Sequence, residues 1–270
     1  MKRAGFLVPV FVILLIMLPV STFAEDSIIG VVETVLQSMT PPDATVAQTS
    51  LGSVAADAAR HCAGTDLAIL NGGDFYSNLQ PGPVTREDVR AVFRTDKRLA
   101  VSGVTYAVLL NLLEFSVSRL VLNENDTIDY ENSSNDAFPQ VSGFSFVCDV
   151  SAPPGSRVLS IRDKSGASLD PDGSYTLAAT EFFLSGGFGN EAVDFMPAGL
   201  CLSDALCGYI VDMGSVNEDT STRIEIYGSL DNSIAGSVSP AIFIILLAAM
   251  VLFAVSSTVR KKEVSGQNAH

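Results

Sequence analysis

Residues 66–73 read Asp66-Leu67-Ala68-Ile69-Leu70-Asn71-Gly72-Gly73, a short apolar run that ends in an Asn-Gly-Gly turn. An apolar run of this length, bounded by turn residues, predicts a buried β-strand at 66–70 and a turn at 71–74. Upstream, residues 51–63 are rich in alanine and carry apolar side chains at helical spacing, which predicts a helix. Downstream, Thr85 stands before a charged turn and predicts the N-cap of a second helix.

The remaining residues up to 227 predict further strands and one more helix. We expect strands at 27–36, 99–101, 144–150, 158–161, 175–179 and 222–227, a long helix at 104–122 and a turn at 170–173. Because these elements do not alternate regularly, the sequence predicts an α+β fold, with a mixed sheet and packed helices. We assign this domain to residues 25–227, a length that suits one domain or two small ones.

The N-terminus has the three parts of a secretory signal peptide. Lys2 and Arg3 are basic, residues 6–20 are almost entirely apolar, and small residues precede Glu25. This pattern predicts a signal peptide at 1–24, with an uncleaved anchor as the alternative. Either form sends the chain into the secretory route.

The C-terminus predicts a membrane span. Residues 240–259 are apolar or small, which is the length that a bilayer core needs, and Arg260, Lys261 and Lys262 follow at once. Basic residues beside a span stay on the cytosolic side, so we expect a type I protein of the plasma membrane or endomembrane, with its domain extracellular or lumenal. Residues 228–239 would be a linker and 260–270 a cytosolic tail. A GPI signal is the alternative, although it would not continue into a basic tail.

The charge of the part between these segments excludes one class of partner. Residues 25–239 hold 11 basic and 29 acidic side chains, a net charge near −18. Such a field repels nucleic acid and anionic lipid, so we expect no nucleic-acid partner. Solubility explains the charge better than an acidic binding role.

The cysteines predict disulfides. All four, Cys62, Cys148, Cys201 and Cys207, lie in the predicted ectodomain, and an even count in an oxidising compartment favours two bonds. The short spacing favours a Cys201–Cys207 pair, with Cys62 and Cys148 left for the other. The sequence alone does not choose among the three pairings.

The polar stretch 123–136 predicts an exposed loop that carries sugar. Asn125 and Asn132 each begin an Asn-x-Ser/Thr acceptor sequence. If they are glycosylated, this loop must face solvent.

Residues for catalysis are scarce. The predicted ectodomain has one histidine, His61, whereas metal-dependent hydrolases need several histidines and carboxylates around a metal. Asp170 and Asp172 fit a plain turn better than a calcium loop. The glycines at 186–189 resemble a phosphate-binding loop only in composition. We therefore expect no catalytic residue, metal site or cofactor in this domain.

Five segments, read in order, resemble the C-terminal domain of the 5'-nucleotidase family. They are residues 51–58, 66–73, 79–85, 138–143 and 182–189, and their order and spacing are kept from about residue 27 to 210. In that family a separate N-terminal domain holds two metals and performs the hydrolysis, while the C-terminal domain grips the nucleotide. The resemblance implies that Phe138 and Phe182 stack on the base and that Asn71 touches it. Core packing is the alternative role for each ring, and a turn role for Asn71.

The sequence also departs from the family pattern. Tyr76 stands where the family has an arginine that holds phosphate, and Phe188 stands where it has a carboxylate that holds the ribose. No basic residue lies between Arg3 and Arg60, so a second phosphate-binding arginine is also missing. The predicted signal peptide leads almost directly into the resembling region and leaves no room for a metal-binding domain.

Three hypotheses of function follow. The first is a pseudoenzyme whose ectodomain binds a nucleoside, a nucleotide or a protein partner and does not catalyse alone. The second is the substrate-binding half of a split 5'-nucleotidase for nucleotide catabolism, completed by a separate metallophosphatase chain. The third is a structural surface protein that uses the fold only as a scaffold.

Overall fold

The computed structural model describes residues 27–228. The predicted signal peptide at 1–24, the span at 240–259, the tail at 260–270 and nearly all of the linker lie outside the described residues. Within 27–228, none of the helices combines the length and the apolar content that crossing a bilayer requires.

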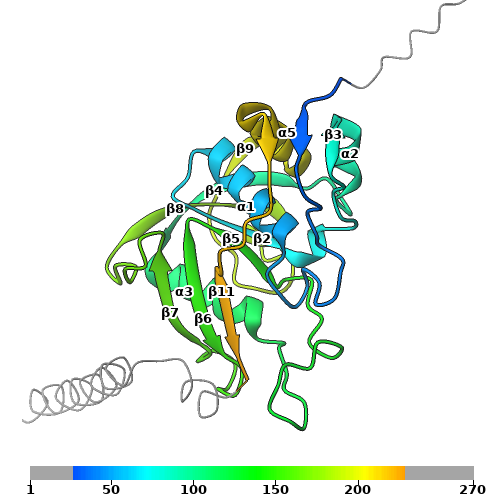
Figure 1. The fold of residues 1–270 in the computed structure, drawn as a ribbon. Helices are drawn as coiled ribbons and strands as arrows, with labels where there is room; N and C mark the ends of the chain where they lie inside the picture. Colours follow the sequence, from blue (N-terminus) through cyan, green and yellow to red (C-terminus); the bar gives the residue numbers. More distant parts are fainter. Residues whose placement is uncertain (1–26, 229–270) are drawn as a thin grey trace, which may run out of the picture.

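A five-stranded sheet of order β5-β2-β8-β4-β9 forms the centre of the domain (Figure 1). Its strands are β2 Leu67–Asn71, β4 Arg98–Thr105, β5 Pro139–Ser142, β8 Ser174–Thr180 and β9 Met196–Cys201. Strands β2 and β8 pair in parallel, and the other neighbours pair antiparallel. Every residue of β2 and β5 is buried, which agrees with the continuous apolar run of β2.

Two three-stranded sheets flank the centre, with orders β10-β1-β3 and β11-β6-β7. Their strands are β1 Gly30–Val32, β3 Gly82–Val84, β10 Ser215–Val216, β6 Phe144–Asp149, β7 Val158–Asp163 and β11 Ile224–Tyr227. Gly143 alone joins β5 to β6, with φ at 90°. A Cβ atom there would lie 2.2 Å from the Asp66 carbonyl oxygen, so only glycine lets the chain pass from one sheet to the next.

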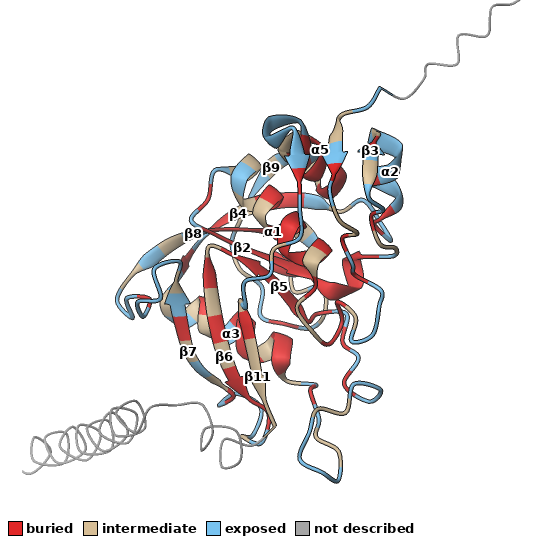
Figure 2. Cartoon of the chain, in the orientation of Figure 1, coloured by how far each residue is buried: buried red, intermediate tan, exposed pale blue. Residues whose placement is uncertain are grey.

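Helices cover the sheets, and the central sheet separates two hydrophobic clusters, since alternate residues of β2 belong to opposite clusters. The helical segments are α1 Ser50–Ala63, η1 Gly72–Asp74, α2 Arg86–Ala91, α3 Tyr106–Val117, α4 Glu181–Leu184 and α5 Leu202–Met213. The first cluster includes the buried faces of α1 and α5, and the second lies among α3, β6 and β7 (Figures 1 and 2). Each fully buried leucine, such as Leu51 or Leu113, contributes about 1.5–3 kcal/mol to folding.

The mixed sheets with packed helices agree with the predicted α+β class. The helix predicted at 51–63 is confirmed as α1, and the Thr85 hydroxyl accepts from the Asp88 amide as the N-cap of α2. The helix predicted at 104–122 is wrong at both ends. Strand β4 runs on to Thr105 because it pairs with β8 along its whole length, and α3 ends at Val117.

The predicted disulfides are corrected by the structure, in which all four cysteines are free thiols. Cys201 is the N-cap of α5 and Cys207 lies six residues further along, which separates them by about 9 Å of helix rise and exceeds the reach of a disulfide. Cys62 packs on the first hydrophobic cluster and Cys148 lies in the second, so these two do not meet either. Burial raises the pKa of the Cys148 thiol to about 12, which keeps it neutral.

Candidate functional site

The carboxyl ends of β2 and β8 meet at one edge of the central sheet, which we call the carboxyl edge. The turn η1 follows β2, and α4 follows β8. Strand β5 begins opposite the end of β2, with Pro139 paired to Asn71, and β4 begins opposite the end of β8. The ends of β2 and β8 and the starts of β5 and β4 therefore meet in one place. The ends of strands commonly present ligand-binding groups.

The turn after β2 is closely packed against its surroundings. A Cβ atom at Gly72 would lie 1.8 Å from the Ala44 carbonyl oxygen, and one at Gly73 would lie 2.5 Å from the Asp136 side chain. The Gly72 amide donates to the Phe138 carbonyl. Only glycine fits at these two positions, which explains the Asn-Gly-Gly sequence in physical terms.

Asp74, the last residue of this turn, is a buried carboxylate with a lysine partner. Its side chain has no exposed surface, and Lys97 Nζ lies 2.5 Å from its Oδ1. Burial raises the pKa of Asp74, and the charge and hydrogen bond of Lys97 oppose that rise. The ion pair ties the start of β4 to the end of β2.

The same lysine contacts two aromatic rings. Lys97 Nζ lies 4.4 Å from the centroid of the Phe182 ring and 5.2 Å from that of Phe188. The two rings meet edge to face, with centroids 4.9 Å apart. Phe182 is 41% exposed, so the carboxyl edge offers solvent an aromatic ring with a cation against it.

The other predicted base-binding residues lie beneath this surface. Phe138 has no exposed surface and belongs to the second hydrophobic cluster. Asn71 is equally buried, yet its amide oxygen has no hydrogen-bond partner among the described residues, and its Nδ2 donates to Ala137 over a long 3.4 Å. A base would reach either residue only after neighbouring side chains moved, and their binding roles stay predictions.

The two residues that depart from the family pattern, Tyr76 and Phe188, lie close to the turn and to the Phe182 ring, respectively. Tyr76 is 64% exposed just after the turn, and the Phe188 ring packs on Phe182 and Phe183. Sequence reasoning missed Lys97 and Asp74, whose meeting no local pattern signals. They matter because Asp74 is a buried carboxylate and Lys97 is the cation paired with it.

The remaining residues singled out from the sequence lie away from this edge. Asn125 and Asn132 are exposed in the loop between α3 and β5, where acceptors must be, and their glycosylation stays a prediction. His61, near the end of α1, pairs on the surface with Asp212 at 3.0 Å. In the part of the chain from 27 to 228, no group of three or more histidine, cysteine or carboxylate side chains is arranged to hold a metal.

A sequence model of the 5'-nucleotidase C-terminal domain matches residues 28–194. The chain belongs to this family. The matched residues include every strand of the central sheet except β9, and also the turn, rings and buried ion pair of the carboxyl edge.

The chain is also similar to two curated proteins. The trifunctional nucleotide phosphoesterase protein YfkN of Bacillus subtilis is 29% identical over 150 residues, 53% of this chain and 10% of YfkN. Endonuclease YhcR of the same organism is 24% identical over 214 residues, 79% of this chain and 15% of YhcR. The chain therefore spans a small part of each of these curated relatives.

Solved structures show the same fold. The 5'-nucleotidase precursor of Thermus thermophilus superposes with a TM-score of 0.63 at 23% identity, over 75% of this chain and 40% of that one. NAD nucleotidase (NadN) of Haemophilus influenzae superposes with a TM-score of 0.61 at 15% identity, over 75% and 38%. At these identities the likeness establishes the architecture of the domain.

Proposed function

We propose that this domain binds the base of a nucleoside or nucleotide at the carboxyl edge and does not hydrolyse it alone. The observation that carries the proposal is the Phe182 ring, which is 41% exposed beside the family's Asn-Gly-Gly turn. Stacking of a base on an aromatic ring contributes about 1–3 kcal/mol. Family membership supports a nucleotide as the class of ligand.

The buried amide of Asn71 supports a base-binding site. Asn71 has an amide oxygen without a partner among the described residues, and such an atom costs about 1–3 kcal/mol when buried. A base edge that donated to this oxygen would recover that cost. Binding would require the turn to open, because Asn71 has no exposed surface in this structure.

The anchors for phosphate and ribose are weak here, which favours recognition of the base. Tyr76 and Phe188 take the places of the arginine and the carboxylate that the family pattern implies. Lys97 remains as a cation at the edge, but Asp74 already neutralises it. The affinity that depends on Phe182 should therefore be about the same for adenosine as for AMP, which would distinguish the carboxyl edge from a phosphate-gripping site.

We further propose a type I arrangement for the whole chain. Residues 1–24 would be a cleaved signal peptide, 240–259 a membrane span, and the domain would be extracellular or lumenal. The support is the sequence pattern at the two ends. Protease digestion of sealed microsomes from expressing cells tests this arrangement. Added protease should remove the cytosolic tail and leave the lumenal domain intact until detergent opens the membrane. Digestion of the domain in intact microsomes would contradict it.

The binding proposal is tested by calorimetry of the full chain in mild detergent against adenosine and AMP. Phe182→Ala should weaken adenosine binding about tenfold, the loss of one stacked ring. Tyr130→Ala is the matched control, because Tyr130 is also an exposed aromatic residue but lies in the 123–136 loop. Absence of adenosine binding, or equal binding by Phe182→Ala, would overturn the proposal.

A second function is favoured by the coverage of the comparisons. The chain covers only 40% of the Thermus 5'-nucleotidase precursor, and the family model that it matches is that of the C-terminal domain. A separate metallophosphatase chain would then supply the hydrolysis. Co-purification of the full chain with metal-dependent AMP phosphatase activity supports this function. Purification of the chain from its native membranes without any such activity argues against it.

A further inference from the structure

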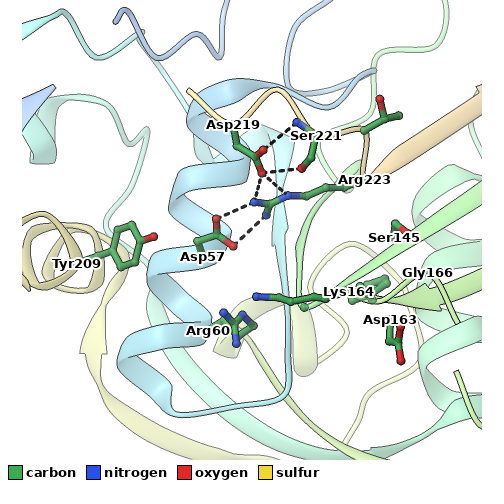
Figure 3. A pocket seen from close by; sticks show the side chains of 13 residues that line it. Asp57, Arg60, Ser145, Asp163, Lys164, Gly166, Tyr209, Asp219, Ser221 and Arg223 are labelled. Atoms are coloured by element: carbon green, nitrogen blue, oxygen red, sulfur yellow. Dashed lines mark hydrogen bonds and ion pairs between the residues drawn. The ribbon is translucent and has the colours of Figure 1, made fainter. Parts of the chain in front are cut away.

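A hollow of about 440 Å³ opens beside the amino end of β2, at the opposite end of that strand from the carboxyl edge. It lies between α1, the β6–β7 hairpin and the loop before β11 (Figure 3). Three basic side chains line it, Arg60, Lys164 and Arg223. Three carboxylates, Asp57, Asp163 and Asp219, line it as well, so the pairing among these charges decides whether the hollow can take an anion.

Arg223 is fully committed to the fold. It forms ion pairs with Asp57 at 2.7 Å and with Asp219, and its Nη1 donates to the Val141 carbonyl at 2.7 Å. Two carboxylates thus neutralise this one guanidinium. Arg223 therefore belongs to the wall of the hollow and does not offer its charge to a ligand.

Arg60 and Lys164 have no such partners. Arg60 Nε donates to Ser142 Oγ at 2.9 Å, but among residues 27–228 no carboxylate lies within 4.0 Å of either cation. The Lys164 amine points toward Arg60 and Asp57 across the hollow (Figure 3). Partial burial lowers the pKa of Lys164 and the charge of Arg60 lowers it further, while the charges of Asp57 and Asp219 oppose this shift.

The neighbouring carboxylates are occupied elsewhere. Asp163 Oδ1 accepts from the backbone and hydroxyl of Ser165, and the Asp163 side chain points away from Lys164 (Figure 3). Asp66 Oδ2 accepts from the backbone and hydroxyl of Thr176. Arg60 and Lys164 therefore face the same hollow without a carboxylate in direct contact, although Asp57 and Asp219, which pair with Arg223, also line it.

The local backbone holds Arg60 in this position. A Cβ atom at Gly143 would lie 3.1 Å from Arg60 Cδ, so the glycine gives the arginine stem its place against the β5–β6 junction. The Ser142 hydroxyl that accepts from Arg60 donates in turn to Asp57 at 2.5 Å. A side chain fixed in this way loses little conformational entropy when it binds an anion.

We propose that this hollow binds a phosphate monoester, with Arg60 and Lys164 as the two ligands of the phosphate. A phosphate monoester is close to a dianion at pH 7, which matches two cations that lack a direct carboxylate partner better than a single carboxylate does. The hollow lies in the range of about 300–1,000 Å³ that takes small organic ligands, so it has room for more than an inorganic ion at 440 Å³. Tyr209 in its lining would contact the organic part.

Calorimetry of the full chain against phenyl phosphate, inorganic phosphate and benzoate tests the proposal. Phenyl phosphate should bind most tightly of the three. Lys164→Gln and Arg60→Gln should each weaken it about tenfold or more, the loss of one charged hydrogen bond. Arg162→Gln is the control, because Arg162 is exposed on the same strand region but does not line the hollow.

Lys164→Gln is the decisive variant, because Lys164 is exposed and makes no hydrogen bond to any described residue, so its replacement leaves the fold intact. Unchanged affinity of Lys164→Gln, or no binding of phenyl phosphate by the wild type, would overturn the site. Equal affinities for benzoate and phenyl phosphate would overturn the assignment of a dianion as the ligand. Equal affinities for inorganic phosphate and phenyl phosphate would overturn the assignment of an ester. The Phe182→Ala variant should bind phenyl phosphate as the wild type does, which separates this site from the carboxyl edge.

Discussion

The two ends of strand β2 treat charge in opposite ways. At the carboxyl edge, Lys97 is neutralised by the buried carboxylate of Asp74 and covered by two aromatic rings. At the amino end, Arg223 is neutralised twice over, while Arg60 and Lys164 have no ion-pair partner among residues 27–228. The Asn-Gly-Gly turn and the two phenylalanines of the family pattern lie at the first end, and the two cations without an ion-pair partner lie at the second.

This difference separates charges that hold the fold from charges that are open to a ligand. A buried, paired charge is costly to disturb, because removal of one partner leaves the other without solvent or counter-ion. An exposed, unpaired cation costs little to remove, and its removal is felt only when an anion is bound. Substitution of a paired charge should therefore lower stability strongly, and substitution of an unpaired, exposed charge should lower it little.

The largest effect is expected from Phe138→Ala. Phe138 is fully buried in the second cluster, so its truncation should lower the free energy of unfolding by about 3–5 kcal/mol through a core cavity. Urea denaturation followed by circular dichroism measures this. Phe182→Ala serves as the comparison, and because that ring is 41% exposed its cost should be well below that of Phe138→Ala. Equal costs would mean that the two rings share one role.

Lys97→Met should come next, at about 3 kcal/mol near pH 7, because it leaves Asp74 as an unpaired buried carboxylate. Burial already raises the pKa of Asp74 in the folded state above its ordinary 3.8, and without Lys97 that pKa rises further. The folded state then binds a proton more readily than the unfolded state, so stability is lost as the pH rises from about 4 through the folded pKa.

The measurement is a series of urea titrations from pH 4 to pH 7. The deficit of Lys97→Met should be smallest near pH 4 and largest near pH 7. An exposed-lysine control, Lys164→Met, should show no such trend. A deficit that does not change with pH would show that Lys97 stabilises the edge by packing on the rings.

A smaller effect is expected from Arg223→Met, about 2 kcal/mol at pH 7, because Asp57 and Asp219 are partly exposed and water relieves them. Lys164→Gln in the same hollow should change the free energy of unfolding by less than about 0.5 kcal/mol. Thermal melts of both variants without added phosphate provide the comparison. A loss as large in Lys164→Gln as in Arg223→Met would mean that Lys164 is part of the fold.

Local signals in the sequence were enough for several elements. The apolar run of β2, the alanine-rich face of α1 and the Thr85 cap each depend on neighbours within a few residues, and each was predicted. The end of β4 was missed because Val104 and Thr105 are fixed by Tyr175 and Ser174, far away in the chain. Helix α5 was missed although Leu202, Leu206 and Ile210 have helical spacing, because Cys201 and Cys207 were interpreted only as a disulfide pair.

The candidate site was predictable only in part, for the same physical reason. The family resemblance gives Phe138 and Phe182 the same predicted role, stacking on the base. Only the three-dimensional packing buries the first ring and exposes the second. Lys97 meets Asp74 across two strand ends, and Arg60 meets Lys164 across a helix and a hairpin. No local pattern records such meetings, because they depend on the register of paired strands.

The strand pairing also sets an order for the synthesis of the protein on the ribosome. Strand β1 pairs in parallel with Ser215 and Val216, and β6 pairs in parallel with β11, which ends at Tyr227. Each early strand thus waits for a partner that is translated near the end of the domain. A nascent chain halted before residue 215 still exposes two open strand edges, and exposed edges recruit chaperones or other chains. Completion of this domain is therefore a late event, which makes premature termination a route to aggregation as well as to loss of function.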